Sequence, residues 1–394
     1  MARFAGGKAP FLRQADQKSY GTNVIMRDFI IALLPVILFS WYKNGIKVYI
    51  EGNINFLEML YPLFFILLGG LLSVIMEGIF FFITDKNNRS FKDILQKISL
   101  SFAAIPGLIL ALLLPLYTPI WVLIFASFVA TIIGKMIFGG FGHNIFNPAL
   151  LGYAVVGFTL MGVVNAAGGV FNASEVIVDS YAGATPLGVL ASGKEIDFNV
   201  LVKPYGDLSN FFIGTIPGAL GETSALAILI GGIYLVIRKV IKWYTPVIYV
   251  GTVFVLSWII GAISGEAGIW FPTYSILTGG VMFAAVFMAT EPVTTPTNML
   301  GKVFFALFLG VLTVLFRFIG NLPEGVGTSL IFMNIFTIPI DKFTAVIRTK
   351  RLAKPAPLYI GILTGLVILL AVYTLIKAGN MYTAFSIPFI GVVI

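Results

Sequence analysis

The chain consists mainly of long apolar stretches separated by short polar ones. An α-helix needs about 20 predominantly apolar residues to cross a bilayer, and several stretches here reach that length. Hydrophobic residues make up 58% of the 394 residues and charged residues only 11%, which is too little charge to cover a soluble domain of this size. The sequence therefore predicts an all-α, polytopic membrane protein.

Hydropathy predicts about 10–11 transmembrane helices. Eleven candidate spans follow one another, at roughly residues 28–42, 60–84, 97–116, 119–138, 147–165, 214–237, 245–263, 275–290, 303–320, 326–340 and 358–376. The first, fifth, eighth and tenth are shorter than an ideal span. Such short spans leave room for tilted or broken helices.

The distribution of basic residues predicts which segments face the cytoplasm. With the N-terminus inside, the predicted inner segments hold 19 of the 25 Lys and Arg residues. Such an excess is typical of cytoplasmic segments. The long segment 166–212 carries five acidic residues against only Lys194 and Lys203, so it is predicted to lie outside.

Five spans precede this outer segment and five follow it, so the second half is predicted to be inverted relative to the first. Inverted repeats with interrupted helices recur where a site must be reached from both sides of the membrane. The predicted regions are an inner N-terminal segment, a first membrane half, an external loop, a second membrane half, and a basic loop with an extra helix and outer tail. They cover residues 1–27, 28–165, 166–212, 213–341 and 342–394.

The chain has no cysteine and a single histidine, His143. Thiolate-ligated iron–sulfur clusters, disulfides and a haem with two histidine ligands are therefore excluded within it. The net charge of +8 follows from the membrane topology, so no nucleic-acid partner is predicted. If the chain carries electrons alone, it needs an organic cofactor or a metal shared with another protein of a complex.

Two acidic residues stand within or at the end of apolar spans. A carboxylate such as Glu77 costs at least about 2–3 kcal/mol to insert into a membrane, so a functional role is the default interpretation. The alternative is a Glu paired with a neighbouring Lys near the inner interface. Asp341 closes the tenth span at the same predicted side, where an acid can simply be solvated. Together they are candidates for an entry route for Na⁺ or H⁺.

Three further polar features each allow more than one interpretation. Arg317 lies among apolar residues, where it can pair with an acid, bind the phosphate of a cofactor or extend to the outer interface. Glu222 is expected in the first turn of the sixth span, where the helix dipole favours an acid. The tripeptide Asn147-Pro148-Ala149 also occurs in water channels, but their pore needs two copies. A single copy favours an ordinary helix start.

The predicted outer segment offers one hydroxyl for covalent attachment of a cofactor. Residues 179–187 read DSYAGATPL, and Thr185 carries that hydroxyl in a polar loop. Few other side chains of the chain offer a route to chemistry, since cysteine is absent and histidine occurs once. This loop is therefore the strongest sequence signal of function.

Several stretches, taken in order, resemble one family. They are residues 139–149 (GGFGHNIFNPA), 221–227 (GETSALA), 287–294 (FMATEPVT), 317–325 and 334–341. The chain resembles the flavin-bearing membrane protein shared by two ion-pumping complexes. These are the Rnf ferredoxin:NAD oxidoreductase, in which it is the D-type subunit, and the Na⁺-translocating NADH:quinone oxidoreductase, in which it is the B-type subunit.

The resemblance implies that FMN is joined through its phosphate to Thr185 by an exported flavin transferase. Asp179, Gly183 and Ala184 match the attachment motif, whereas Ala182 stands where the family has Ser or Thr. The acceptor hydroxyl is retained despite that departure. The predicted outside position of Thr185 agrees with modification by an exported enzyme. The resemblance also implies that the protein lies in the cytoplasmic (inner) membrane of a bacterium or archaeon.

The resemblance also implies a second, non-covalent flavin, riboflavin, deeper in the helix bundle. Asn144 and Asn147 match residues near that site, and Glu77 and Asp341 match acids linked to cation uptake. The implied partners are the other subunits of an Rnf-like or NADH:quinone oxidoreductase-like complex, including an external FMN-bearing one. The protein would position the flavins, which supply the redox chemistry.

Three functions stay open at this level. The first is an electron-transfer subunit of an ion-translocating oxidoreductase complex, which is not expected to act alone. The second is a flavinylated conduit for extracellular electron transfer without pumping. The third is a solute transporter or channel in which the loop at 179–187 is coincidental.

Overall fold

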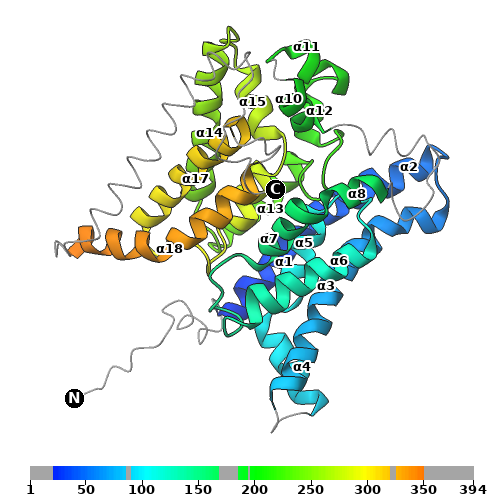
Figure 1. Cartoon of the computed structure of the whole chain (residues 1–394), viewed down its shortest axis with the longest axis vertical. Coiled ribbons are helices and arrows are strands. Elements are labelled where there is room, and N and C mark those ends of the chain that lie inside the picture. Colours follow the sequence, from blue (N-terminus) through cyan, green and yellow to red (C-terminus); the bar gives the residue numbers. More distant parts are fainter. Residues whose placement is uncertain (1–20, 86–89, 168–184, 194–195, 320–324, 350–394) are drawn as a thin grey trace.

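The computed structural model describes residues 21–85, 90–167, 185–193, 196–319 and 325–349 (Figure 1). Every regular element of these residues is a helix, as the sequence predicts. The predicted eleventh span at 358–376 lies outside the described residues, as do Asp179, Gly183 and Ala184 of the attachment loop.

The first half contains five successive helical segments. They are α1 (Thr22–Trp41) with its extensions η2 (Tyr42–Ile46) and α2 (Lys47–Ile50); α3 (Phe56–Thr84); α4 (Phe91–Ser101) with α5 (Ala104–Leu113); α6 (Ile120–Phe128) with η3 (Val129–Met136); and α7 (Pro148–Val155) with η4 (Val156–Leu160) and α8 (Met161–Ala167).

The second half repeats this number of segments. They are α13 (Ala225–Ile237); α14 (Tyr244–Ile263); α15 (Trp270–Leu277) with α16 (Val281–Phe283) and η6 (Ala284–Met288); α17 (Met299–Ile319); and α18 (Val326–Thr349). In the part of the connection that the structure describes, residues 185–193 and 196–224, there are four short helices: α10 (Pro186–Gly193), α11 (Phe198–Leu201), η5 (Lys203–Tyr205) and α12 (Leu208–Ile213).

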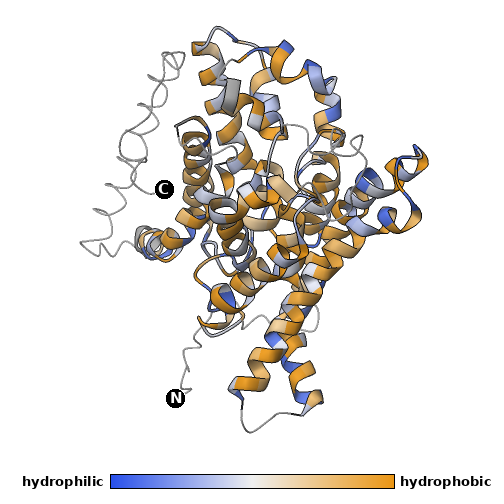
Figure 2. Ribbon diagram, turned by 45° about the vertical axis from the view of Figure 1, so that its right-hand side comes forward, coloured by the Kyte–Doolittle hydropathy of each residue, from blue (hydrophilic) through white to orange (hydrophobic). Residues whose placement is uncertain are grey.

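Five of the described helices are long and apolar enough to cross a membrane, and seven spans result when each bent pair counts as one. The other predicted spans among the described residues correspond to the shorter apolar helices Ile120–Met136 and Ala225–Ile237 and to α18. Large apolar side chains such as Leu38, Leu67 and Leu71 are exposed on the helices. The ribbon in Figure 2 is mostly hydrophobic along the helices in the middle of the molecule, with more hydrophilic residues toward its ends. This distribution is that of a polytopic membrane protein.

Several predicted boundaries are wrong. The first span was expected at 28–42 and shorter than an ideal span, but its helix runs from Thr22 to Ile50. The sixth span was expected from residue 214, but residues 214–224 form turns and α13 begins only at Ala225. Ser224 caps that helix by accepting a hydrogen bond from the Ala227 N–H at 3.2 Å, so Glu222 precedes the helix instead of lying in its first turn. The tenth span was expected to end at 340, but α18 continues to Thr349.

The third segment of each half is broken. In the first half α4 and α5 meet at 54°, and in the second half α15 meets the α16–η6 helix at 65°. One residue at each break has a left-handed backbone, Phe102 with φ 52° and Gly279 with φ 63°. The breaks therefore occupy corresponding positions in the two sets of five segments.

Small residues allow the helices around these breaks to pack closely. A Cβ atom on Gly107 of α5 would overlap the carbonyl oxygen of Gly69 on α3. A Cβ on Gly231 of α13 would likewise overlap the carbonyl oxygen of Ala32 on α1. Close backbone approach of this kind is how helices associate in membranes, and the contacts α3–α5 and α1–α13 are among the most extensive in the bundle.

Candidate functional site

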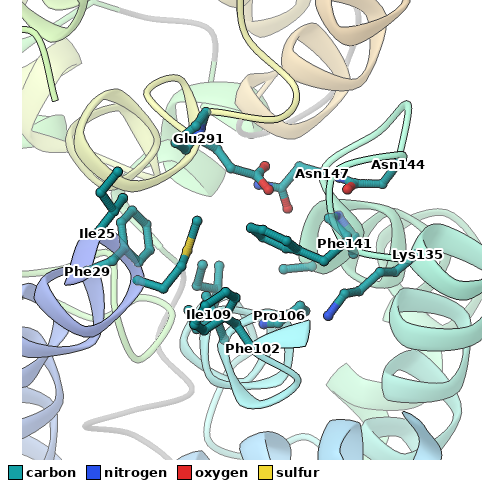
Figure 3. A pocket seen from close by; sticks show the side chains of 15 residues that line it. Ile25, Phe29, Phe102, Pro106, Ile109, Lys135, Phe141, Asn144, Asn147 and Glu291 are labelled. Carbon is teal, nitrogen blue, oxygen red and sulfur yellow. The ribbon is translucent and has the colours of Figure 1, made fainter. Parts of the chain in front are cut away.

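A narrow pocket lies beside the broken helix α4–α5. Its wall is formed by the start of α1, by α5, by the end of η3, by the loop before α7 and by the loop after η6 (Figure 3). The lining residues used below are Phe102, Lys135, Phe141, Asn144, Asn147 and Glu291. The pocket therefore collects residues from both membrane halves, and the predicted Asn144 and Asn147 both lie in it.

Glu77 and Lys135 form a completely buried ion pair next to this pocket. Glu77 on α3 is 0% exposed and Lys135 on η3 is 2% exposed, and the Lys135 ammonium donates to Oε1 of Glu77. The same ammonium donates to the Ser101 carbonyl oxygen at 2.7 Å, where α4 ends. The interpretation of Glu77 as an acid paired with a lysine is therefore confirmed, although the pair lies deep in the bundle and not at its edge.

A second polar group crosses the interface between the two halves. Asn147 Nδ2 donates to Glu291 Oε2 at 2.8 Å, and the Asn147 backbone N–H donates to Asn334 Oδ1 at 3.1 Å. Asn147 Oδ1 accepts from the Leu150 N–H at 3.1 Å, so the residue also caps α7, with Pro148 as the first helical residue. The prediction of an ordinary helix start is confirmed.

Glu291 is buried in the loop after η6. It also accepts a hydrogen bond from Thr294 Oγ1 at 2.9 Å. Burial raises the pKa of the Glu291 carboxyl from 4.5 to about 7, although hydrogen bonds from Thr294 and Asn147 and the charge of Lys135 act in the opposite direction. Near neutral pH this carboxyl exists in both protonation states.

Asp341 lies apart from this pocket. Its two carboxylate oxygens accept hydrogen bonds from the Thr297 N–H at 3.0 Å, from Thr297 Oγ1 at 3.0 Å and from Asn298 Nδ2 at 2.9 Å. The acid thus fastens the loop before α17 to α18. Glu77 and Asp341, predicted to share a route, have different partners on different elements.

Arg317 of α17 is buried at the other broken helix. Its guanidinium donates to the Ser275 carbonyl oxygen at 2.6 Å and to the Thr278 carbonyl oxygen at 3.4 Å, where α15 ends. At 7% exposure it does not extend to the interface, so that alternative is wrong. Glu222 approaches the same break, because a Cβ on Gly280 would lie 2.7 Å from its Oε1.

Thr185 is exposed at the start of α10. Its Oγ1 accepts a hydrogen bond from the Gly188 N–H at 3.1 Å. Tyr274 of α15 donates to the Pro186 carbonyl oxygen at 2.6 Å, which fixes this helix start to the second half. In Figure 1, α10 lies at one end of the molecule and α4 at the opposite end. His143 is exposed near the entrance to α7 and is not among the residues that line the pocket.

Sequence reasoning missed Lys135, Glu291 and Phe102 as site residues. Lys135 was counted only as a topology signal, although it lies within the predicted span 119–138, shortly before the glycine-rich stretch of the family motif. Glu291 was noted only within the matching stretch 287–294. Both are charged residues within or beside apolar segments, which is the signal that singled out Glu77.

Comparisons with known proteins agree with the resemblance found in the sequence. Residues 7–350 match the family described as NQR2, RnfD, RnfE. The chain belongs to this family. It is 34% identical over 341 residues to the D-type subunit of the proton-translocating ferredoxin:NAD(+) oxidoreductase complex of Clostridium ljungdahlii, covering 83% of this chain and 92% of the relative.

Two more relatives come from both branches of the family. The D-type subunit of the Na(+)-translocating ferredoxin:NAD(+) oxidoreductase complex of Acetobacterium woodii is 30% identical, with 82% of this chain and 90% of the relative covered. The B-type subunit of the Na(+)-translocating NADH-quinone reductase of Chromohalobacter salexigens is 34% identical, with 64% and 60% covered. The relatives thus include complexes named for protons and complexes named for Na⁺.

Proposed function

We propose that this family member is the flavin-carrying membrane subunit of an ion-translocating oxidoreductase complex of the Rnf type, and that it is not active alone. The observation that carries this proposal is the match over nearly the whole length of two D-type relatives, combined with a hydroxyl at the loop position predicted to carry FMN. The proposed location is the inner membrane, with the attachment loop outside. The proposed partners are the other subunits of the complex, including an external FMN-bearing one.

The surroundings of Thr185 suit a phosphoester of FMN. The side chain is exposed, so a flavin transferase can reach it. It stands at the N-terminus of α10, where the helix dipole favours negative charge such as a phosphodiester. The bond from Tyr274 to the Pro186 carbonyl holds the helix start at a fixed place. A flavin attached here supplies the electron-transfer chemistry, and the chain restricts where its ring can move.

The pocket near Asn144 and Asn147 does not fit riboflavin in its present form. Its volume is about 40 Å³, which is room for a few water molecules, whereas sites for ligands of flavin size measure roughly 300–1,000 Å³. The side chains of Phe102 and Phe141 would have to move to admit a three-ring system. No step of the proposed function is therefore assigned to a second flavin in this pocket.

Covalent attachment is tested by in-gel fluorescence after denaturing electrophoresis, with the transferase co-expressed, followed by peptide mass mapping. The wild-type chain is expected to give a fluorescent band with the mass of FMN on the peptide that contains Thr185. Thr185→Ala should abolish the fluorescence while the protein still inserts into the membrane. Thr215→Ala is the matched control, because Thr215 is another exposed threonine on the same connection.

A Thr185→Ala band that stays fluorescent would overturn the attachment site. Ion translocation is tested separately, by cation uptake into vesicles that contain the assembled complex during electron transfer. A fluorescent chain without coupled uptake would identify the conduit without pumping instead.

A further inference from the structure

The Glu77–Lys135 pair resembles an oxygen-lined cation site that is occupied by the protein's own ammonium group. The ammonium contacts a carboxylate oxygen of Glu77 and the Ser101 carbonyl oxygen. One helical turn away on the same two elements, Thr131 Oγ1 donates to Ser73 Oγ at 2.9 Å, and both hydroxyls are buried with 0% exposure. Because residues four apart lie on one face of a helix, these oxygens line the same interface.

The carboxylate of Glu77 is only partly satisfied in this arrangement. Its Oε2 is buried and has no hydrogen-bond partner among the described residues. Buried polar atoms are nearly always paired, so an exception calls for an explanation. Carboxylate, hydroxyl and carbonyl oxygens are the ligands that hard metal cations prefer. A proton would need only one of these oxygens, so a set of this kind favours a metal ion.

The ammonium group of Lys135 has a second possible position, inside the pocket. It lines the pocket as well as contacting Glu77, and Glu291 on the far wall attracts it electrostatically. In Figure 3 the ring of Phe141 lies between Lys135 and the Asn147–Glu291 pair. The flexible four-carbon stem of a lysine allows its ammonium to turn into the pocket without movement of the helix.

We propose that Lys135 is a tethered counter-ion that competes with Na⁺ for Glu77. While its ammonium contacts Glu77, the site is closed to other cations. When negative charge in the pocket draws the ammonium away, Na⁺ binds to Glu77 together with Ser73 Oγ, Thr131 Oγ1 and the Ser101 carbonyl oxygen. The inference rests on the proposed function, since it explains how charge in this protein would control cation binding during translocation.

The direct test removes the tethered cation and asks whether Na⁺ replaces it. Lys135→Met should lower the melting temperature of the protein in the assembled complex, by several degrees in choline chloride at pH 8, because Glu77 is left buried and unpaired. NaCl at the same ionic strength should restore most of that loss. The wild type and the double variant Lys135→Met/Glu77→Gln should show no difference between the two salts.

Two controls separate this role from mere stabilisation. Lys97→Met removes a lysine that pairs with Asp85 nearer the surface, and it should give no Na⁺-specific recovery. Ser73→Ala in the Lys135→Met background should weaken the recovery by Na⁺. If NaCl and choline chloride give the same melting temperature for Lys135→Met, the proposal is overturned. This readout needs no flavin and no turnover, so it stands apart from the test of the proposed function.

Should Lys135→Met fail to accumulate, Lys135→Arg provides a second route. An arginine keeps the charge but can hold both oxygens of Glu77 with its fork of donors. The Na⁺ concentration that gives half-maximal turnover should then rise about tenfold or more, with the amount of covalent flavin unchanged. An unaltered Na⁺ dependence in a folded Lys135→Arg complex would contradict the proposal.

Discussion

At both broken helices a basic side chain donates to backbone carbonyl oxygens at the break, but the basic residue differs. At each break, a cation from the fourth segment of its half donates to carbonyl oxygens that the broken helix leaves without intrahelical partners. Lys135 does this at the end of α4, and Arg317 does it at the end of α15. In both halves the basic residue therefore supplies hydrogen-bond donors to carbonyl oxygens of irregular backbone. Inside a membrane such oxygens need partners from the protein itself.

The difference between the two residues indicates at which break the contacts of the basic residue can change. Arg317 offers a rigid fork of donors and contacts two carbonyl oxygens. Lys135 is a point charge on a flexible stem, shared between a carbonyl and a carboxylate that has one oxygen without a hydrogen bond among the described residues. We infer that the contacts of Arg317 stay the same during function, and that those of Lys135 change. The break at the end of α15 is called fixed below for this reason, and the break at the end of α4 is called adjustable. A fixed break beside the proposed FMN loop and an adjustable one beside the pocket suit different tasks in one protein.

Removing Arg317 should give the largest structural effect. Arg317→Met leaves two buried carbonyl oxygens without their donor and should destabilise the protein by about 2–4 kcal/mol. Arg317→Lys should cost roughly half as much, because one donor can still reach the Ser275 oxygen. Melting temperatures measured in NaCl and in choline chloride would check this. If NaCl restored the melting temperature of Arg317→Met, the proposed difference between the two broken helices would be wrong, because the break at Arg317 would then also bind Na⁺.

Replacing Glu291 should flatten the pH dependence of stability. A carboxyl whose pKa rises from 4.5 in the unfolded chain to about 7 in the folded one favours the folded state at low pH. This contribution is complete below pH 4.5 and is lost as the pH rises through 7. At about 1.4 kcal/mol per pKa unit, the loss is at most about 3 kcal/mol. Glu291→Gln should show a smaller fall in melting temperature between pH 5 and pH 8 than the wild type. An identical pH profile would remove Glu291 as the titrating group of the pocket.

Changing Asn147 should have a smaller effect that reports on the contact between the halves. Asn147→Ser keeps a helix cap but loses the amide donor to Glu291, at a cost of about 1–2 kcal/mol. Asn55→Ser is the matched control, because Asn55 caps α3 through the Glu58 N–H at 3.0 Å without a contact between the halves. Equal losses in melting temperature for the two variants would show that the Asn147–Glu291 bond contributes nothing to stability.

Much of the fold could be predicted from hydropathy because the membrane selects long apolar helices. The order of the segments, the helix start at Asn147 and the buried acid Glu77 all follow from local patterns. The break at Phe102 could not be located in this way, because a phenylalanine rarely adopts a left-handed backbone. Gly279 was placed inside a continuous span, because glycine is also frequent in membrane helices. Lys135 and Glu291 were missed as pocket residues for another reason: they lie far apart in the sequence, and only tertiary packing brings them into the pocket with Asn144 and Asn147.

The left-handed residues at the two breaks allow the finest comparison. Gly279 adopts φ 63° without a side chain, so Gly279→Ala should cost about 1 kcal/mol of backbone strain. Phe102 adopts φ 52° with a large side chain, whose ring contacts that of Phe141 at a centroid distance of 5.2 Å. Phe102→Gly should relieve strain of similar size while losing the ring contact, worth about 0.5–1.5 kcal/mol beyond the burial of this partly buried ring. Its net loss of stability should therefore stay below that of a core phenylalanine, about 3–5 kcal/mol. A loss that large would show that the ring, and not the strained backbone, defines the break beside Lys135.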